Sequence, residues 1–361
     1  MNYSLTIKKI SKISLLLIVM STIVGCKDDF KTTKEDIISI EAPEGMIWIP
    51  NKTFLQGAKE NDNYAMGREK PAHYVKVDGF FIDITEVTNK QFKAFVDATG
   101  YLTIAEREID WEEIKKQVPE GTPKPHDSIL KPGSLIFNKK ANGIVNMQNY
   151  LQWWTWKIGA NWKQPQGPDS SIEGQDNYPV VHISFEDAQA YCKWANRRLP
   201  TEAEWESAAQ GKNTVAIFTW GNNPDLLNEK ANTWQGVFPT VNEPIDGFKY
   251  ISPVKSYDPN SLGLYDMSGN VWEITSDFFS TNYYNTLTIN EITINPKGAK
   301  KTYTPANPYA TEYVIKGGSF LCNASYCASY RISARMGMSV DSGSDHIGFR
   351  TVATTEMLSE K

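Results

Sequence analysis

Histidine and cysteine are scarce in this sequence, with four residues of each among 361. The histidines are His73, His126, His182 and His346. They form no recognisable Ser-His-acid set, so nothing supports a hydrolase of that type. An excess of positive charge is also lacking, because 37 basic and 42 acidic residues give a net charge of -5 and are mixed along the chain. Without a cationic face for a phosphate backbone, we expect no nucleic-acid partner.

The N-terminus lacks an apolar run long enough to span a bilayer comfortably, since only residues 13–24 are apolar after a cluster of lysines. This pattern is typical of a secretory signal. It ends in Ile-Val-Gly-Cys at residues 23–26, which resembles a bacterial lipobox. We therefore expect residues 1–25 to be a lipoprotein signal peptide and Cys26 to be acylated, with an uncleaved anchor helix as the alternative. The lipid would be the only membrane contact and would hold the protein in the bacterial envelope, in the periplasm or at the outer membrane.

Export changes the interpretation of the other cysteines, because an oxidising compartment normally pairs thiols into disulfides. With Cys26 assigned to the lipid, Cys192, Cys322 and Cys327 form an odd set. At least one thiol should therefore be free or bound to a metal. Cys192 lies on the apolar face of an expected helix and is interpreted as a packed core residue. For the other two, spacing alone leaves a small disulfide and a metal-binding thiol pair both open.

The mature chain is expected to hold a short tether and one folded domain. Residues 26–42 are polar and charged with little to bury, which is typical of a tether. The domain would occupy residues 43–355. Its composition includes 24 glycines and 19 prolines, and many turn-forming pairs, so we expect modest regular secondary structure.

Local patterns predict three helices and a few short strands. Capping boxes, in which a Ser or Thr is answered three residues later by an acid or amide, place helix starts at Thr88, Ser184 and Thr201. Strands are expected at residues 46–50, 53–57 and 74–81. Between about residues 106 and 149 prolines and charges accumulate without a period, which indicates a long surface excursion.

Several segments between Gly45 and Val352 form a shared pattern. They are residues 83–89, Trp153-Trp154 with residues 159–162, residues 198–206, residues 263–273, Gly317-Gly318-Ser319 and Gly348-Phe349-Arg350. Together they resemble the formylglycine-generating enzyme, or sulfatase-modifying factor, family. The resemblance implies an irregular α+β domain of that family's own fold, distantly similar to C-type lectins and low in regular secondary structure. Relatives that are not oxidases share these segments, so the segments alone leave the chemistry open.

The segment from Gly317 to Cys327 resembles the catalytic segment of the active enzymes, with both cysteines present. The resemblance implies that Cys322 and Cys327 bind Cu(I) and that dioxygen is used to oxidise a cysteine to Cα-formylglycine. Thiolate ligands do favour Cu(I) over hard cations. A structural zinc site would instead need about four protein ligands, and no further Cys or His stands at ligand spacing. In this context we favour the copper site over a structural disulfide.

Further site residues follow from the same resemblance. Ser319 and Tyr326 would line the active site, and Trp272 would form a pocket wall. Two structural calcium sites are also implied, with the apolar members contributing backbone carbonyls. The first set is Asn232, Thr233, Asp246 and Phe248, and the second is Asp266, Gly269, Val271 and Glu273. Arg331 and Arg335 are interpreted either as residues that lower thiol pKa values or as ion-pair residues.

The implied substrates are sulfatase polypeptides that carry an extended Cys-x-Pro-x-Arg segment. An acid should receive the arginine, and Asp341 and Asp345 are the candidates. His346 stands where many relatives have asparagine and is interpreted as a groove residue. We expect a monomer. The competing hypothesis is a catalytically silent, lectin-like binding or secretion-scaffold lipoprotein on the same fold, which the cysteine pair argues against.

Overall fold

The structure, a computed structural model, describes residues 41–140, 143, 146–147 and 149–359. The expected signal peptide and Cys26 lie outside the described residues. Within them, no helix is long and apolar enough to cross a membrane.

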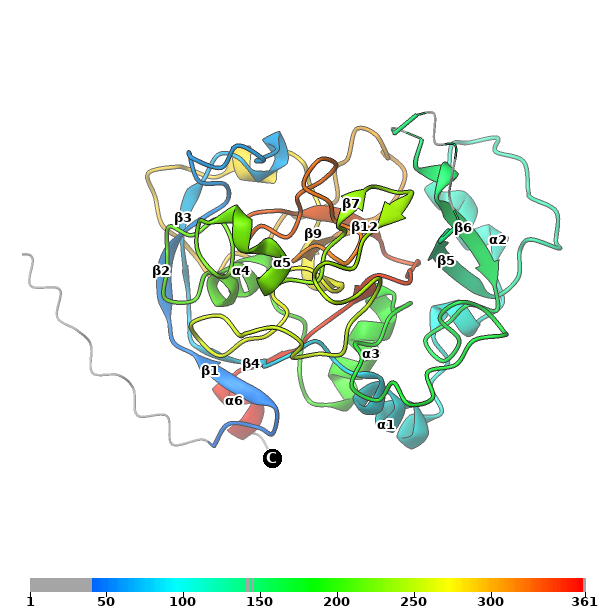
Figure 1. Ribbon diagram of the computed structural model, residues 1–361, viewed down its shortest axis with the longest axis horizontal. Coiled ribbons are helices and arrows are strands. Elements are labelled where there is room, and N and C mark those ends of the chain that lie inside the picture. Colours follow the sequence, from blue (N-terminus) through cyan, green and yellow to red (C-terminus); the bar gives the residue numbers. More distant parts are fainter. Residues whose placement is uncertain (1–40, 141–142, 144–145, 148, 360–361) are drawn as a thin grey trace, which may run out of the picture. The chain divides into compact units, whose positions relative to one another are not determined.

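Fourteen short strands, counted over the described residues, form several small sheets. The central sheet has the order β12-β11-β9-β13, in which β11 is antiparallel to both neighbours and β13 is parallel to β9. Its strands are β9 (Trp272–Phe278), β11 (Glu312–Lys316), β12 (Met336–Ser339) and β13 (Ile347–Gly348). Figure 1 shows β9 and β12 near the middle of the folded part, so this sheet is surrounded by the other elements.

Two three-stranded sheets and two hairpins complete the β structure. The first three-stranded sheet contains β1 (Met46–Ile49), β4 (Phe80–Asp83) and β14 (Val352–Ala353). The second contains β10 (Thr293–Ile294), β3 (His73–Val77) and β2 (Lys52–Gln56). The hairpins are β5 (Gly133–Phe137) with β6 (Trp154–Ile158), and β7 (Gly236–Val237) with β8 (Val241–Asn242).

The three helices predicted from capping boxes are confirmed. They are α1 (Asn89–Thr99), α3 (Phe185–Trp194) and α4 (Glu202–Gln210). In α1 the Thr88 hydroxyl accepts from the Gln91 N–H, while the Gln91 side chain accepts from the Thr88 N–H at 2.8 Å. The same reciprocal pairs close α3 and α4, so these helix starts are set by residues three apart. Shorter helices are α2 (Trp111–Ile114), α5 (Leu227–Lys230) and α6 (Thr355–Ser359).

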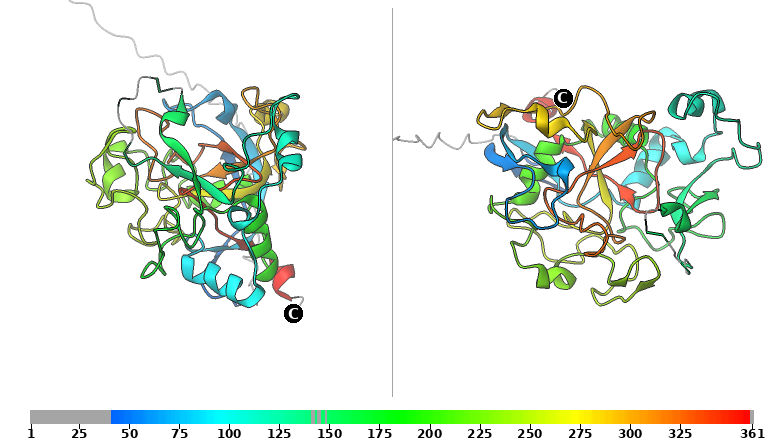
Figure 2. Two further views of the ribbon diagram at one scale, coloured as in Figure 1. Left: turned by 90° about the vertical axis from the view of Figure 1, so that its right-hand side faces the viewer. Right: turned by 90° about the horizontal axis from the view of Figure 1, so that it is seen from above.

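Two expectations about the strands were wrong in part. The strand predicted over residues 74–81 is split into β3 and β4, which belong to different sheets. At the break, a Cβ on Gly79 would lie 2.2 Å from the Trp48 ring, so the chain bends where only glycine fits. The excursion over residues 106–149 is also more structured than expected, because β5 pairs with β6 and α2 lies on the same side (Figures 1 and 2).

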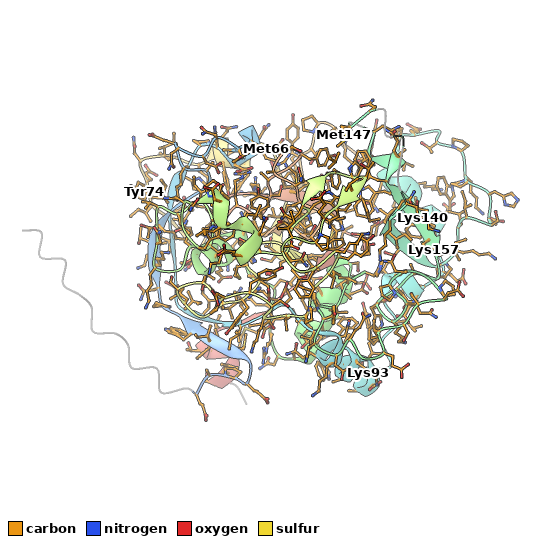
Figure 3. All side chains as sticks on the ribbon, viewed as in Figure 1. Met66, Tyr74, Lys93, Lys140, Met147 and Lys157 are labelled. Atoms are coloured by element: carbon orange, nitrogen blue, oxygen red, sulfur yellow. The ribbon has the colours of Figure 1, made fainter. Side chains whose placement is uncertain are left out.

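The core consists of three clusters of buried apolar side chains. One joins α1 and α3 to the central sheet, and a second packs α4 against the sheets of β1–β4. The third is mainly aromatic and contains Phe137, Trp153, Trp234, Phe238, Phe320 and Leu321. The outside is mixed: lysines such as Lys93 and Lys140 lie beside exposed apolar side chains such as Tyr74 and Met147 (Figure 3). The segment with both cysteines leaves β11 between the first and third clusters.

Candidate active site

The cysteine segment is bent by two consecutive glycines directly after β11. Gly317 and Gly318 have φ values of 89° and 73°, a region that side chains rarely adopt. A Cβ on Gly318 would also lie 2.8 Å from the backbone of Ser329 and Tyr330. The glycines therefore let the start of the segment pack directly against its end, which closes the loop that carries both thiols.

Asn323 organises the rest of this loop. Its carbonyl oxygen accepts from the N–H groups of Tyr326, Cys327 and Ala328 at 3.0–3.1 Å. Its side-chain amide donates to the carbonyls of Trp234 and Gly236 at 3.0 and 3.2 Å. The result is a tight turn that returns Cys327 to the neighbourhood of Cys322. Nothing in the sequence indicates this role, since an asparagine in a loop has no distinctive signal.

The two thiols of the loop lie side by side. Cys322 and Cys327 are free, and their side chains form a hydrogen bond with each other. Cys322 is buried and its sulfur also accepts from the Ser319 N–H at 3.4 Å, whereas Cys327 is partly exposed. The structure thus brings the predicted pair together. Cys192, the third free cysteine, is buried on α3, as expected.

The two thiols differ strongly in acidity. The hydrogen bond from Cys322 lowers the pKa of Cys327 to about 7, with further help from the N–H groups of Ser329 and Asn323. Burial raises the pKa of Cys322 well above its ordinary value, and the neighbouring Cys327 raises it further. Cys327 is therefore the more acidic thiol of the pair, and Cys322 is the thiol that donates to it when it ionises.

The arginines that follow the loop are ion-pair residues. Arg331 is buried and binds Asp62 and Glu69, each at 2.6 Å. Arg335 is buried against Glu202 at 2.7 Å. Neither guanidinium is among the causes of the low pKa of Cys327, so the ion-pair interpretation holds. The cation that does interact with Cys327 is Arg68, which precedes β3 and carried no signal in the sequence.

Ser319, Tyr326 and Trp272 surround the thiols in different ways. Ser319 is fully buried, and its hydroxyl accepts from the Leu321 N–H at 3.2 Å. Trp272 is buried in the same core cluster as Cys322. Tyr326 is 41% exposed, and its ring stacks on Phe238 at a centroid distance of 4.8 Å. Tyr326 is therefore the most accessible of the three predicted residues.

The first predicted calcium set converges in the structure. Both Asp246 carboxylate oxygens face backbone N–H groups, those of Thr233 at 2.9 Å and Phe248 at 3.1 Å. The Asn232 amide nitrogen donates to the Tyr250 carbonyl, which fixes the amide, and its buried oxygen has no hydrogen-bond partner in the described part of the chain. A buried carbonyl oxygen without a donor suits a hard cation, so these residues fit calcium.

The second predicted set fits less well. Both Glu273 oxygens bind Arg350, at 2.6 and 2.7 Å, and one also accepts from the Trp205 indole. Burial raises the pKa of Asp266 to about 6, and this carboxyl forms a hydrogen bond with Glu86. Calcium could use Asp266 with the carbonyls of Gly269 and Val271. To bind as well, Glu273 would have to lose a hydrogen bond from Arg350 or Trp205. This set is the weaker candidate for a metal site.

Comparisons with known proteins bear on the same residues. Residues 33–355 match the model of the sulfatase-modifying factor enzyme 1-like domain. The chain is 40% identical to a formylglycine-generating enzyme of Thermomonospora curvata over 87% of this chain and 94% of that protein. It is 42% identical to one of Mycobacterium tuberculosis, covering 85% and 97%. An inactive C-alpha-formylglycine-generating enzyme 2 of Mus musculus is 35% identical, covering 86% and 85%.

Among solved structures, PvdO from Pseudomonas aeruginosa has a similar fold. It superimposes with a TM-score of 0.55 at 21% identity, over 85% of this chain and 93% of that one. This likeness and the mixed, loop-rich architecture confirm the predicted α+β fold.

Proposed function

The chain belongs to the sulfatase-modifying factor family, and on this premise we propose that it converts a cysteine of sulfatases to Cα-formylglycine. Family membership alone leaves activity undecided, because one similar protein is named as inactive. The observation that carries the proposal is the pair of hydrogen-bonded thiols, Cys322 and Cys327, in the loop bent by Gly317 and Gly318.

The donor set fits Cu(I). Two sulfurs lie together, and among the described residues no group of three or more His, Cys, Asp or Glu side chains could hold a metal ion. Soft thiolates bind Cu(I), whereas structural zinc needs about four protein ligands. When bound by Cys322 and Cys327, Cu(I) supplies the redox chemistry with dioxygen that the oxidation of cysteine requires.

The protein's own groups prepare this site. Cys327 ionises more readily than an ordinary thiol, while binding of a metal by both sulfurs must also displace the proton of Cys322. Burial of Cys322, Ser319 and Trp272 keeps water from the inner side. Cys327 is the more exposed residue of the pair, so the substrate cysteine is proposed to approach from its side.

The substrate is proposed to be an extended Cys-x-Pro-x-Arg segment. The exposed ring of Tyr326, backed by Phe238 and Trp153, offers an aromatic surface for the proline. For the arginine, Asp341 is the better of the two candidate acids, because it is only half-buried and already accepts from the Gln117 amide at 2.6 Å. Asp345 is buried and lines a cavity to which neither cysteine contributes.

We also propose where the protein is located and which structural metal ions it holds. Cys26 would carry a lipid that holds a monomeric domain in the bacterial envelope, where exported sulfatases pass. Calcium would be structural. One ion would lie at Asn232, Thr233, Asp246 and Phe248, and a second at Asp266, Gly269, Val271 and Glu273. Metabolic labelling with a palmitate analogue would test the lipid, which should be lost in Cys26→Ser.

The activity is tested with the purified protein, Cu(I), dioxygen and a Cys-x-Pro-x-Arg peptide. Mass spectrometry should show the cysteine converted to the aldehyde, which a hydrazide probe should capture. A peptide with serine in place of the cysteine is the matched control and should remain unchanged. Absence of aldehyde with copper-loaded, folded protein would instead support the silent binding or scaffold function.

A further inference from the structure

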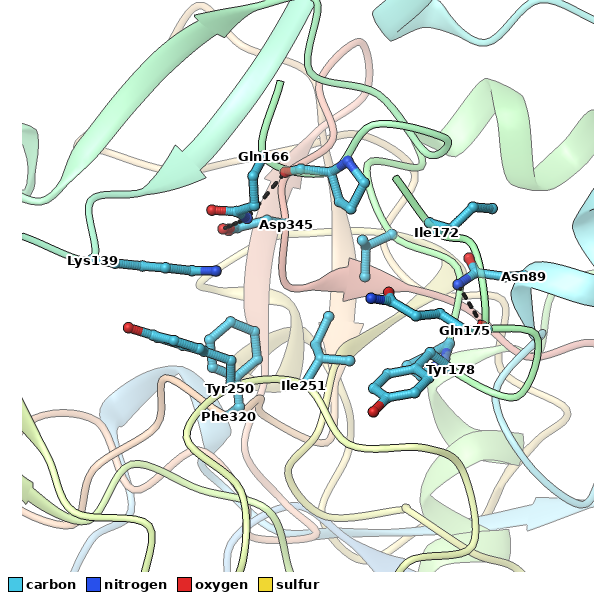
Figure 4. A pocket seen from close by; sticks show the side chains of 13 residues that line it. Asn89, Lys139, Gln166, Ile172, Gln175, Tyr178, Tyr250, Ile251, Phe320 and Asp345 are labelled. Atoms are coloured by element: carbon cyan, nitrogen blue, oxygen red, sulfur yellow. Dashed lines mark hydrogen bonds between the residues drawn. The ribbon is translucent and has the colours of Figure 1, made fainter. Parts of the chain in front are cut away.

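A separate cavity of about 270 Å³ lies beside the cysteine loop (Figure 4). Phe320, two residues before Cys322, forms part of its wall, but neither cysteine lines it. Most of the other lining residues come from the segment between β6 and α3, from Pro165 to Val181. The rest are Asn89 at the start of α1, Lys139 after β5, Tyr250 and Ile251 after β8, and Asp345 before β13. The cavity is thus built by parts of the chain that the proposed oxidation does not use.

One wall carries a buried carboxylate that lacks a partner. One oxygen of Asp345 accepts from the Phe137 N–H at 3.0 Å and from the Gln166 amide at 3.3 Å. The other oxygen is buried without a hydrogen-bond partner in the described structure, and Asp345 as a whole is only 3% exposed. A buried charge in this state is unfavourable, and a cationic group in the cavity would relieve it.

Close to Asp345 in Figure 4, the cavity also carries the ammonium of Lys139. In Figure 4 the Lys139 side chain points into the cavity, and its nitrogen lies 4.2 Å from the centre of the Tyr250 ring. Within the described residues Lys139 forms no ion pair, although Asp345 is near enough to oppose the lowering of the Lys139 pKa by burial. Two opposite charges therefore line one cavity and attract each other without a direct ion pair.

The remaining lining suits a small polar molecule. Asn89, Gln166 and Gln175 contribute amide groups, while Ile251 and Phe320 contribute apolar surface (Figure 4). Amides can bind either end of a polar ligand, and the apolar side chains can cover a short hydrocarbon part. The volume is just below the range of sites for drug-sized ligands, which favours a ligand of a few heavy atoms.

We propose that this cavity binds a free α-amino acid, with its ammonium against Asp345 and its carboxylate against Lys139. A zwitterion matches both charges at once, whereas a simple cation would be repelled by Lys139 and a simple anion by Asp345. The site is independent of the proposed oxidation, because it shares no reacting group with the thiol pair.

Isothermal titration of the purified protein with a panel of α-amino acids tests the proposal. At least one should bind saturably. Its amide, which lacks the carboxylate, and its N-acetyl derivative, which lacks the ammonium, should each bind roughly tenfold more weakly or worse, since each loses a charged hydrogen bond. Asp345→Asn and Lys139→Met should weaken binding of the parent amino acid by a similar factor.

Lys140→Met is the matched control, because Lys140 adjoins Lys139 in the sequence but does not line the cavity, so this variant should leave binding unchanged. Asp345→Asn keeps an oxygen for the Phe137 N–H, and circular dichroism checks that it folds; Lys139→Met carries the test if it does not. Unchanged binding in both variants, or no saturable binding by any amino acid, would overturn the proposal. Cys322→Ser should bind normally, which separates this outcome from failure of the proposed oxidation.

Discussion

Arg331 and Cys322 are both buried in the same region, but their side chains differ in the partners that they have. Arg331 has two carboxylate partners, Asp62 and Glu69, and a third acceptor in the Ala328 carbonyl. Cys322 and Cys327 have mainly each other, with a few N–H groups. The difference indicates that the ion pairs hold the loop, while the thiols keep binding capacity for something else.

The largest change in stability is expected from breaking the ion-pair region. Arg331→Met would leave Asp62 and Glu69 buried without their cation, which should lower the free energy of unfolding by about 3–5 kcal/mol. Urea unfolding followed by circular dichroism measures it. Lys93→Met removes an exposed pair with Asp97 and should cost at most about 0.5 kcal/mol. Equal effects of the two substitutions would contradict the scaffold role of Arg331.

Calcium removal is expected to have the next largest effect. If the first calcium set binds an ion, chelation should lower the free energy of unfolding by about 2.7 kcal/mol when calcium had been present at 100 times its dissociation constant. Thermal unfolding with and without chelator measures this. Asn232→Ala removes the unpartnered oxygen, so most of the chelator-sensitive part should disappear. A chelator effect of unchanged size in this variant would remove Asn232 from the ligand set.

The thiol pair should respond to pH as a donor and an acceptor. Cys327 has a pKa lowered to about 7, so its alkylation by iodoacetamide should rise as pH increases through 7. Cys322→Ala removes the main donor, and the midpoint should then move upward by about one unit or more, equivalent to roughly 1.4 kcal/mol. Mass spectrometry of the modified peptide reports the site. A midpoint that stays near 7 would assign the shift to another group.

The smallest effect is expected at Arg68. This guanidinium interacts with the charge of Cys327 through space and is not its direct partner. Arg68→Gln should therefore raise the alkylation midpoint of Cys327 by less than Cys322→Ala does, and the difference should shrink in high salt. The same alkylation series measures both variants. A larger shift than that of Cys322→Ala would make Arg68, and not the thiol pair, the main source of acidity.

Local features of the fold were predictable where the residues that determine them are close together in the sequence. The starts of α1, α3 and α4 depend on residues three apart, and the bend before the thiols depends on two adjacent glycines. The short separation of Cys322 and Cys327, with four residues between them, likewise favours their convergence within one turn. These features were predictable because local hydrogen bonds and backbone sterics fix them.

Features built from distant partners were not predictable. Glu69 and Arg331 pair across 262 residues, and Asn323 anchors its turn on carbonyls of Trp234 and Gly236. The pairing of β5 with β6 was missed for the same reason, since β5 has no marked period and its partner β6 starts 17 residues after β5 ends. The cavity at Asp345 and Lys139 also requires six separate parts of the chain to meet. Such contacts are set by tertiary packing, which a single sequence leaves open.

The central claim is that Cys322 and Cys327 together form the reactive centre, and three single substitutions test it most directly. Cys322→Ser, Cys327→Ser and Cys192→Ser are each loaded with Cu(I) and assayed for aldehyde formation on the Cys-x-Pro-x-Arg peptide. We predict that the first two form no aldehyde, whereas Cys192→Ser, altered at the buried thiol on α3, retains the activity of the unmodified protein. Full turnover by Cys322→Ser or by Cys327→Ser would contradict the account.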